Sequence, residues 1–191
     1  MSKPNPLREL SRRFPAPPEL KSIIDDFLVL PDRSSAIVGV ALIESLLEKL
    51  MIKKMVEQSE SQRSSLFGNR GPLADLSSKI LVATAFGIIP SNVADELNRL
   101  RNIRNVFAHT MAPISFDTKE VVNELRKSKI VQILLSHFPE KQGTFTNLSH
   151  FKILVEIHCV VLSATHKSAG GEDWFAGVYA STSRPTADEA K

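Results

Sequence analysis

The sequence predicts an all-α protein that folds as a single helical bundle of about six to seven helices. Its 191 residues are 42% hydrophobic, which suffices for the core of one domain. Leu, Ile, Ala, Glu and Lys, residues that are common in helices, make up a large part of the composition. The chain has only 8 glycines, one Tyr and one Trp, and this argues against a sheet-rich fold.

The two ends of the chain differ in composition from the part between them. Residues 1–19 contain five prolines and three arginines, which predicts a flexible, Pro-rich basic arm. Residues 20–167 carry the helical patterns and are expected to form the folded domain. Residues 168–191 consist mainly of small residues and are interpreted as a tail. Its aromatic side chains, which could dock on the domain, are Trp174, Phe175 and Tyr179.

The first half of the domain predicts two helices and a loop. A short amphipathic helix from Glu19 to Leu30 is closed by Pro31. Asp32 is expected to cap a long helix from Arg33 to Glu57, whose apolar residues recur at helical spacing. Residues 58–71 are polar and rich in serine, so we expect a loop there.

Two further helices are predicted in the middle of the domain. One runs from Leu73 to Phe86, beginning at Pro72, where proline costs no hydrogen bond, and stopping at Gly87. The next has Ser91 as its cap and ends at about His109.

The last third of the domain predicts two more helices. Asp117 and Glu120 have the spacing of a capping box and open a helix that can bend before it ends at Phe138. Residues 139–143 turn the chain. An apolar helix then runs from Asn147 to about Lys167.

Composition also limits the class of protein. The net charge of +3 permits contact with nucleic acid without requiring it. The single cysteine, Cys159, excludes an internal disulfide and a Cys-rich zinc site. No apolar run is expected to span a membrane, and the first residues lack a signal-peptide core. His150, His158 and His166 are eight residues apart and do not share a helix face. We therefore expect a cytoplasmic protein without membrane contact, metal or cofactor.

The helix before His109 carries an unusual density of polar side chains. Placed at about 100° per residue, its apolar residues form one sector that should face the core. Arg104 falls inside that sector, and Arg101 lies at the edge of a second, polar stripe. The residues of the polar stripe are Asn98, Asn102, Asn105 and His109.

Two interpretations of this helix follow. In the functional one, Arg104, Asn105 and His109 form a polar site, because arginine can stabilise a phosphate and histidine can move a proton near neutral pH. In the structural one, Arg104 pairs with a buried acid and His109 caps the helix. The residue pattern favours the structural interpretation, since ion pairs within a fold produce it too. Expected members of structural pairs are Asp32, Arg33 and Asp75, and further acids that could hold Arg104 are Glu44, Asp95 and Asp117.

The loop from Leu66 to Leu73 is a second candidate site. It sets Arg70 between two glycines ahead of a predicted helix, where a glycine-rich loop can hold an anion. A tight turn that needs a positive φ explains it equally simply and is favoured. The loop has no Walker A lysine pattern, so ATP binding is not supported. The candidate binding residues of the chain are Arg70, Asn98, Arg101 and Asn102.

Parts of the sequence resemble two known groups of proteins. The hexapeptide R-N-V-F-A-H (104–109) fits the R-x4-H pattern of the HEPN superfamily. A longer match is to the mannitol operon repressor family, and it covers about residues 20–135. Its segments, which recur there in the same order, are Asp32–Glu48, Leu66–Ile89, Glu96–His109 and Ile114–Asp117.

The resemblance implies an all-helical transcriptional regulator, a repressor that lacks a helix-turn-helix. Such a protein acts through a protein partner or a homodimer, and any contact with RNA or DNA is indirect. The HEPN resemblance implies an alternative, a metal-independent ribonuclease or toxin. Arg104 and His109 of two protomers would then meet across a dimer, with Asn105 as the polar residue that follows the arginine. The basic arm from Lys3 to Arg13 leaves direct DNA binding as a third hypothesis.

Overall fold

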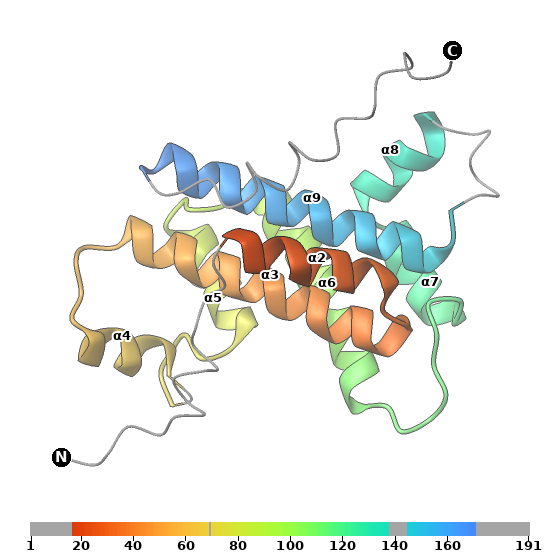
Figure 1. The fold of residues 1–191 in the computed structure, drawn as a ribbon, viewed down its shortest axis with the longest axis horizontal. Coiled ribbons are helices and arrows are strands. Elements are labelled where there is room, and N and C mark those ends of the chain that lie inside the picture. Colours follow the sequence, from red (N-terminus) through yellow and green to blue (C-terminus); the bar gives the residue numbers. More distant parts are fainter. Residues whose placement is uncertain (1–16, 69, 138–144, 171–191) are drawn as a thin grey trace.

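The computed structural model describes residues 17–68, 70–137 and 145–170. These residues form helices and no strand, so the all-α prediction is confirmed (Figure 1). Most of the predicted arm and tail lies outside the described residues. The helices are α2 (Pro17–Val29), α3 (Asp32–Lys54), α4 (Glu60–Phe67), α5 (Leu76–Ala85), α6 (Ser91–His109), α7 (Lys119–Arg126), α8 (Lys129–His137) and α9 (Asn147–Ser168).

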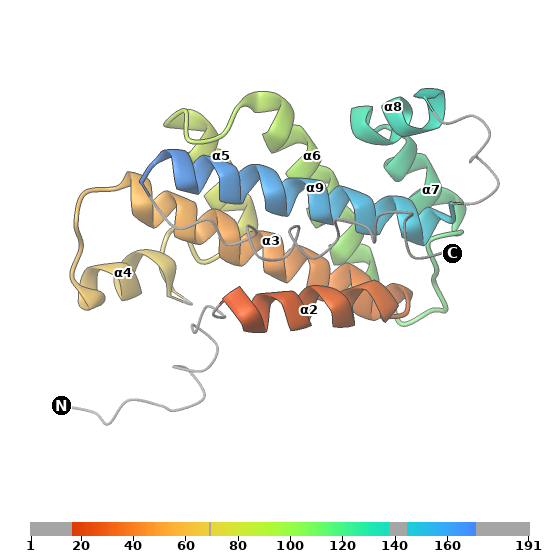
Figure 2. The same ribbon diagram turned by 45° about the horizontal axis from the view of Figure 1, so that its top comes forward.

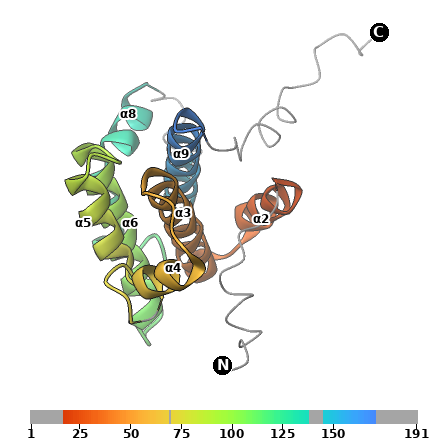
Figure 3. The ribbon, with the colours of Figure 1, turned by 90° about the vertical axis from the view of Figure 1, so that its left-hand side faces the viewer.

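The helices form three layers, and the middle layer is the pair of α3 and α9. α3 and α9 lie side by side and run in the same direction (Figures 1 and 2). Seen along this pair, α2 covers one side and α5 with α6 covers the other (Figure 3). α7 and α8 pack near the start of α9, and α4 lies at the opposite end of the molecule (Figure 1). The most extensive contact is between α3 and α9, followed by that between α3 and α6.

The core is built from the facing sides of α3, α6 and α9. Leu46, Leu47 and Leu50 of α3 are fully buried. A row of phenylalanines joins three segments: the ring of Phe116 lies 4.8 Å from that of Phe107 and 4.7 Å from that of Phe151. These contacts fix α6, the segment after it and α9 relative to one another, because apolar side chains in a close-packed interior have one arrangement.

α2 is held against the central pair by a polar anchor. Lys152 of α9 is buried, and its Nζ donates hydrogen bonds to the carbonyls of Leu28 (2.7 Å) and Leu30 (3.0 Å) at the end of α2. Burial lowers the pKa of Lys152, and the charge of Asp32 opposes this effect. The carbonyls at a helix end lack partners within the helix, so a lysine there satisfies them.

α9 corrects one expectation about membranes. With 22 residues and a mean hydropathy of 1.3, it is long and apolar enough to cross one. In the structure it is the central helix of the bundle, where Phe151, Leu154 and Leu162 are fully buried. A central helix reaches such a hydropathy because the side that faces the other helices is apolar.

The polar loop predicted for residues 58–71 is wrong in its first half, which forms α4. The helix begins with a reciprocal capping box. The backbone N–H of Gln62 donates to Ser59 Oγ (3.3 Å), and the N–H of Ser59 donates to Gln62 Oε1 (2.9 Å). The S-x-x-Q signal was present in the sequence, but it lay in a run too polar to indicate a helix by its apolar spacing.

Other boundaries also differ from the prediction. α5 begins at Leu76, after a turn, rather than directly behind Pro72. Asp32 and Ser91 are the first residues of α3 and α6, and the prolines before them occupy the cap positions. The expected capping box at Asp117 is absent, since α7 begins at Lys119 and the Asp117 carboxylate accepts a hydrogen bond from Asn147 (2.8 Å). The helix predicted to reach Phe138 breaks at Ser128 into α7 and α8.

Candidate functional site

The polar stripe predicted on α6 lies at the surface, opposite the core. Leu97, Leu100, Ile103 and Phe107 point inward and are at most 2% exposed. On the other side, Asn102 and His109 are exposed, whereas Asn98, Arg101 and Asn105 are half-buried. We call Asn98, Arg101, Asn102, Arg104, Asn105 and His109 the α6 polar face.

Arg104 does not form the predicted structural ion pair. It is half-buried, and no hydrogen bond or ion pair joins it to another described residue. Two of the acids considered for it have other partners, since Asp32 binds the backbone and Glu44 binds Lys79. The aliphatic part of an arginine side chain can pack along apolar residues while the guanidinium stays in contact with solvent. The position of Arg104 within the apolar sector therefore did not require a buried guanidinium.

Arg101 also has hydrogen-bonding capacity to spare. Its Nη2 donates to Asn102 Oδ1 of the neighbouring residue (3.3 Å), a long and local contact. Its Nε is buried and has no hydrogen-bond partner. A guanidinium carries five N–H donors in a planar fork that matches carboxylates and phosphates. Arg101 and Arg104 therefore present cationic donors that the described fold does not use.

The C-terminus of α6 is capped by Arg33 rather than by His109. Arg33 Nη1 donates to the carbonyl of Phe107 (2.5 Å), and Nη2 donates to that of Thr110 (3.0 Å). Beside it, the Asp32 carboxylate accepts from the backbone N–H of Phe116 (2.7 Å). The first turn of α3 thus clamps the end of α6 and the segment after it.

The other predicted members of structural pairs behave differently. Asp32 and Arg33 both bind backbone groups rather than a charged partner. Asp75 is exposed at the N-cap position of α5, and its side chain makes no capping hydrogen bond. The sequence indicated structural roles for Asp32 and Arg33. Their hydrogen-bond partners were not predictable, because these backbone groups lie more than 70 residues away along the chain.

The two residues of the R-x4-H pattern do not converge within one chain. Five residues along a helix correspond to a rotation of about 140° and a rise of about 7.5 Å. His109 is exposed and, like Asn105, makes no hydrogen bond to a residue of the described ranges. A site that uses Arg104 together with His109 would therefore need groups from a second molecule.

The loop before α5 is a tight turn, for a reason other than the one expected. A Cβ on Gly71 would lie 2.2 Å from the Leu66 carbonyl oxygen, so only glycine fits there. The backbone of Gly71 does not have the expected positive φ. The N–H of Leu73 binds that same carbonyl (2.9 Å), which turns the chain away from α4. Arg70 is exposed on this turn and has no partner among the described residues.

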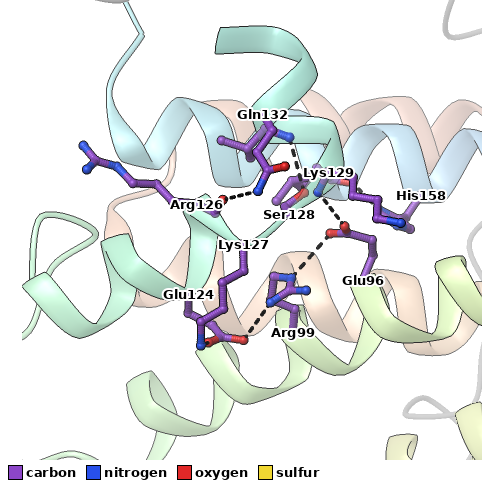
Figure 4. Close-up of polar contacts among 11 residues, drawn as sticks. Glu96, Arg99, Glu124, Arg126, Lys127, Ser128, Lys129, Gln132 and His158 are labelled. Atoms are coloured by element: carbon purple, nitrogen blue, oxygen red, sulfur yellow. Dashed lines mark hydrogen bonds and ion pairs between the residues drawn. The ribbon is translucent and has the colours of Figure 1, made fainter. Parts of the chain in front are cut away.

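An ion network that the sequence did not reveal lies on the opposite flank of α6 and runs from the buried Glu96 to the exposed Lys127 (Figure 4). Glu96 is only 7% exposed, and its Oε1 accepts from the backbone N–H of Lys129 (3.0 Å). Arg99 Nη1 binds Glu124 Oε1 (3.1 Å), whose other oxygen binds Lys127 Nζ (2.7 Å). The network holds the break between α7 and α8 against α6. Arg99 forms its ion pairs within this network, whereas Arg101 and Arg104 do not take part in it. Glu96 and Arg99 are three residues apart on α6, and this spacing was the one feature of the sequence that indicated an ion pair here.

His158 lies beside this network and is 2% exposed. Its Nδ1 donates to the carbonyl of Leu154 (2.7 Å). Burial lowers the pKa of His158, while the bond to Leu154 and the charge of Glu96 oppose the shift. Cys159, the next residue, is also buried, and burial raises the pKa of its thiol. Both groups are enclosed by protein, so neither can meet a substrate.

Metal chemistry is not indicated by the described residues, where no group of three or more His, Cys, Asp and Glu side chains could hold an ion. What the described residues offer instead is a surface on α6 with two unpaired arginines, three amides and a histidine. Such a surface can bind carboxylates, phosphates or backbone carbonyls of another molecule.

Comparisons with known proteins give one informative result. No family model matches the sequence, and no curated protein matches it. Among solved structures, the chain is similar to a chain in the X-ray structure of the MtlR-HPr complex from Escherichia coli, with a TM-score of 0.59 and 14% sequence identity. The match covers 74% of this chain and 96% of that chain. The resemblance to mannitol operon repressors is thus confirmed at the level of the fold.

Proposed function

We propose that this protein is an MtlR-like regulator that acts by binding a protein partner. The observation that supports it most strongly is the shared fold, which extends over 96% of a chain in the MtlR-HPr complex. MtlR of that structure is bound to HPr, which makes HPr the first partner to test here.

The surface that we assign to the partner is the α6 polar face. Interfaces commonly place arginines at their energetic centre, and unpaired guanidinium groups are ready to bind carboxylates there. Arg101 and Arg104 meet this description. Two exposed apolar side chains belong to α6 and the segment after it, since Val106 is 45% exposed and Met111 is 99% exposed. Together these groups supply both polar and apolar contacts for a protein surface.

Calorimetric titration of the full chain with HPr tests the proposal. The double variant Arg101→Ala/Arg104→Ala should weaken binding by roughly tenfold or more, as expected when two interface arginines are lost. Arg126→Ala is the matched control, because Arg126 is an exposed arginine on α7, away from the α6 polar face. Binding that is unchanged in the double variant would remove this face from the interface. No binding of HPr at all would exclude HPr as the partner.

A metal-independent ribonuclease is the second candidate function. Its support is that Arg104, Asn105 and His109, all on α6, make no hydrogen bond or ion pair to another residue that the structure describes. Two copies would have to bring Arg104 of one chain near His109 of the other. Incubation of the purified chain with RNA in the presence of a chelator tests this function. Cleavage that disappears in His109→Ala supports it, and RNA that stays intact with the unmodified chain refutes it.

A further inference from the structure

A second surface feature lies at the end of the molecule farthest from α7 and α8. There a cavity of about 500 Å³ opens between the C-terminal end of α3, α4 and the end of α5. Met55, Val56, Leu66, Val82, Phe86 and Ile88 give it a largely apolar lining. Two of these side chains lie mostly in solvent, with Phe86 78% and Val56 85% exposed. Large apolar groups gathered around a concave surface mark a binding site, since their contact with water is unfavourable and their burial by another group lowers the free energy.

The described chain ends close to this cavity. α9 and α3 run in parallel and finish at the same end of the molecule (Figure 2). A Cβ on Gly170, just after α9, would lie 4.0 Å from Lys53 Cε in the last turn of α3. Lys54 follows Lys53 and lines the cavity. Gly170 has a φ of +81°, a conformation that ends a helix and turns the chain away from its axis.

The residues after this point have the chemistry that the cavity lacks. Residues 171–175 read G-E-D-W-F, two acids followed by two aromatic residues. Four extended residues span about 13–14 Å, enough to carry Trp174 from the end of α9 past Lys53. Lys53 and Lys54 are exposed, and neither makes an ion pair with a described residue. Along the tail, two acids come before two aromatic residues. Going from the end of α9, the two lysines likewise come before the apolar lining of the cavity.

We propose that residues 172–175 dock on this cavity within the same chain. Glu172 and Asp173 lie against Lys53 and Lys54, and Trp174 and Phe175 cover Val56 and Phe86. Burial of an aromatic side chain removes much apolar area from water, and the short connection makes the docking intramolecular, with a high effective concentration. The tail thereby shields an apolar surface that would otherwise be open to other proteins. This surface is distinct from the α6 polar face.

Tryptophan fluorescence tests the proposal directly, because Trp174 is the only tryptophan in the chain. In the full-length protein, its emission should be blue-shifted and less quenched by acrylamide than in the urea-unfolded chain. Phe86→Asp and Val56→Asp should each shift the emission to the red and restore quenching. Leu81→Asp is the matched control: Leu81 is 69% exposed on α5 but does not line the cavity, so the signal should stay unchanged.

Four results would contradict the proposal. Emission of a solvent-exposed indole in the unmodified protein would show that the tail is undocked. Emission that stays blue-shifted in both Phe86→Asp and Val56→Asp would place Trp174 elsewhere. A blue shift that disappears on dilution would assign the cavity to the tail of a second copy. Charge reversal in Lys53→Glu/Lys54→Glu should also shift the emission to the red, and an unchanged spectrum would contradict the assigned position of Glu172 and Asp173.

Discussion

Arg33, at the start of α3, donates a hydrogen bond of 2.5 Å to the carbonyl of Phe107, in the last turn of α6. The cation sits at the end of a helix whose final carbonyls have no partners within the helix, where positive charge is favoured. Arg33 thus holds the same end of α6 at which the α6 polar face ends with His109. The stability of the proposed partner-binding surface therefore depends on a residue of another helix.

Removal of this cap should destabilise the fold. We expect Arg33→Ala to lower the free energy of unfolding by about 1–2 kcal/mol, because hydrogen bonds from a charged donor to two carbonyls are lost. Arg33→Lys should recover only part of the loss, since a lysine ammonium cannot reproduce the two-pronged contact. Urea unfolding measures both values. Arg104→Ala is the control and should change stability little, and an equal loss in that variant would contradict the assignment of roles to the two arginines.

Lys79 forms a bridge between α5 and α3 that should be sensitive to single substitutions. Its Nζ lies 2.9 Å from Glu44 and 2.8 Å from Glu48, and the lysine is 4% exposed. Lys79→Met leaves two neighbouring carboxylates without a cation, so we expect a loss of about 2–3 kcal/mol. This is less than for a fully buried pair, because both glutamates reach solvent. Adding Glu44→Gln and Glu48→Gln to Lys79→Met should restore part of the loss in urea unfolding, and no recovery would refute the electrostatic origin.

The same bridge predicts behaviour at high pH. Burial opposes the charge of Lys79, but its hydrogen bonds to Glu48 and Glu44 outweigh that effect and raise its pKa above 10.5. The folded state then holds the proton more tightly than the unfolded state. This contribution to stability is complete below pH 10.5 and is lost as the pH rises through the folded pKa. Unfolding free energies measured from pH 9 upward should fall less steeply in Lys79→Met, and parallel curves would contradict the prediction.

His158 predicts the opposite dependence at mildly acidic pH. Burial is the main cause of its lowered pKa, so below the unfolded value of 6.5 the unfolded chain binds protons more readily. Stability should therefore be complete above pH 6.5 and fall by up to about 1.4 kcal/mol for each pH unit below it, until the folded pKa is reached. His158→Phe should reduce the slope between pH 7.5 and 5.5 in urea unfolding. If the slope is unchanged, His158 is not the group that titrates.

Two glycines should respond differently to asparagine. Gly87 has a φ of +64° with open space around it, so Gly87→Ala should cost about 1–2 kcal/mol and Gly87→Asn less, because asparagine tolerates this conformation. At Gly71 the obstacle is backbone contact rather than φ. Gly71→Asn should therefore be at least as destabilising as Gly71→Ala. Thermal unfolding of the four variants measures the order, and relief by asparagine at Gly71 would contradict the steric explanation.

The helices with sustained apolar spacing were predictable from the sequence. α3, α6 and α9 lie close to their expected bounds, since periodicity over many residues identifies both a helix and its buried side. The short helices were less predictable. α4 lacks buried residues, and its only strong signal was the capping box at Ser59. The break at Ser128 was expected only as a bend, because it is held by Glu96 from a distant part of the chain.

The all-α class, the long helices and the position of the polar stripe on α6 could be predicted from the amino-acid sequence, because they depend on the order of residues along one helix. Which charged side chains form ion pairs or hydrogen bonds could be seen only in the folded arrangement of the helices. Arg33 and Arg99 have partners, whereas Arg101 and Arg104 have guanidinium donors that no described residue accepts from. Helical periodicity gives the direction of a side chain about its own axis, but a partner's position depends on how separate helices pack, and that arrangement is set by the whole core.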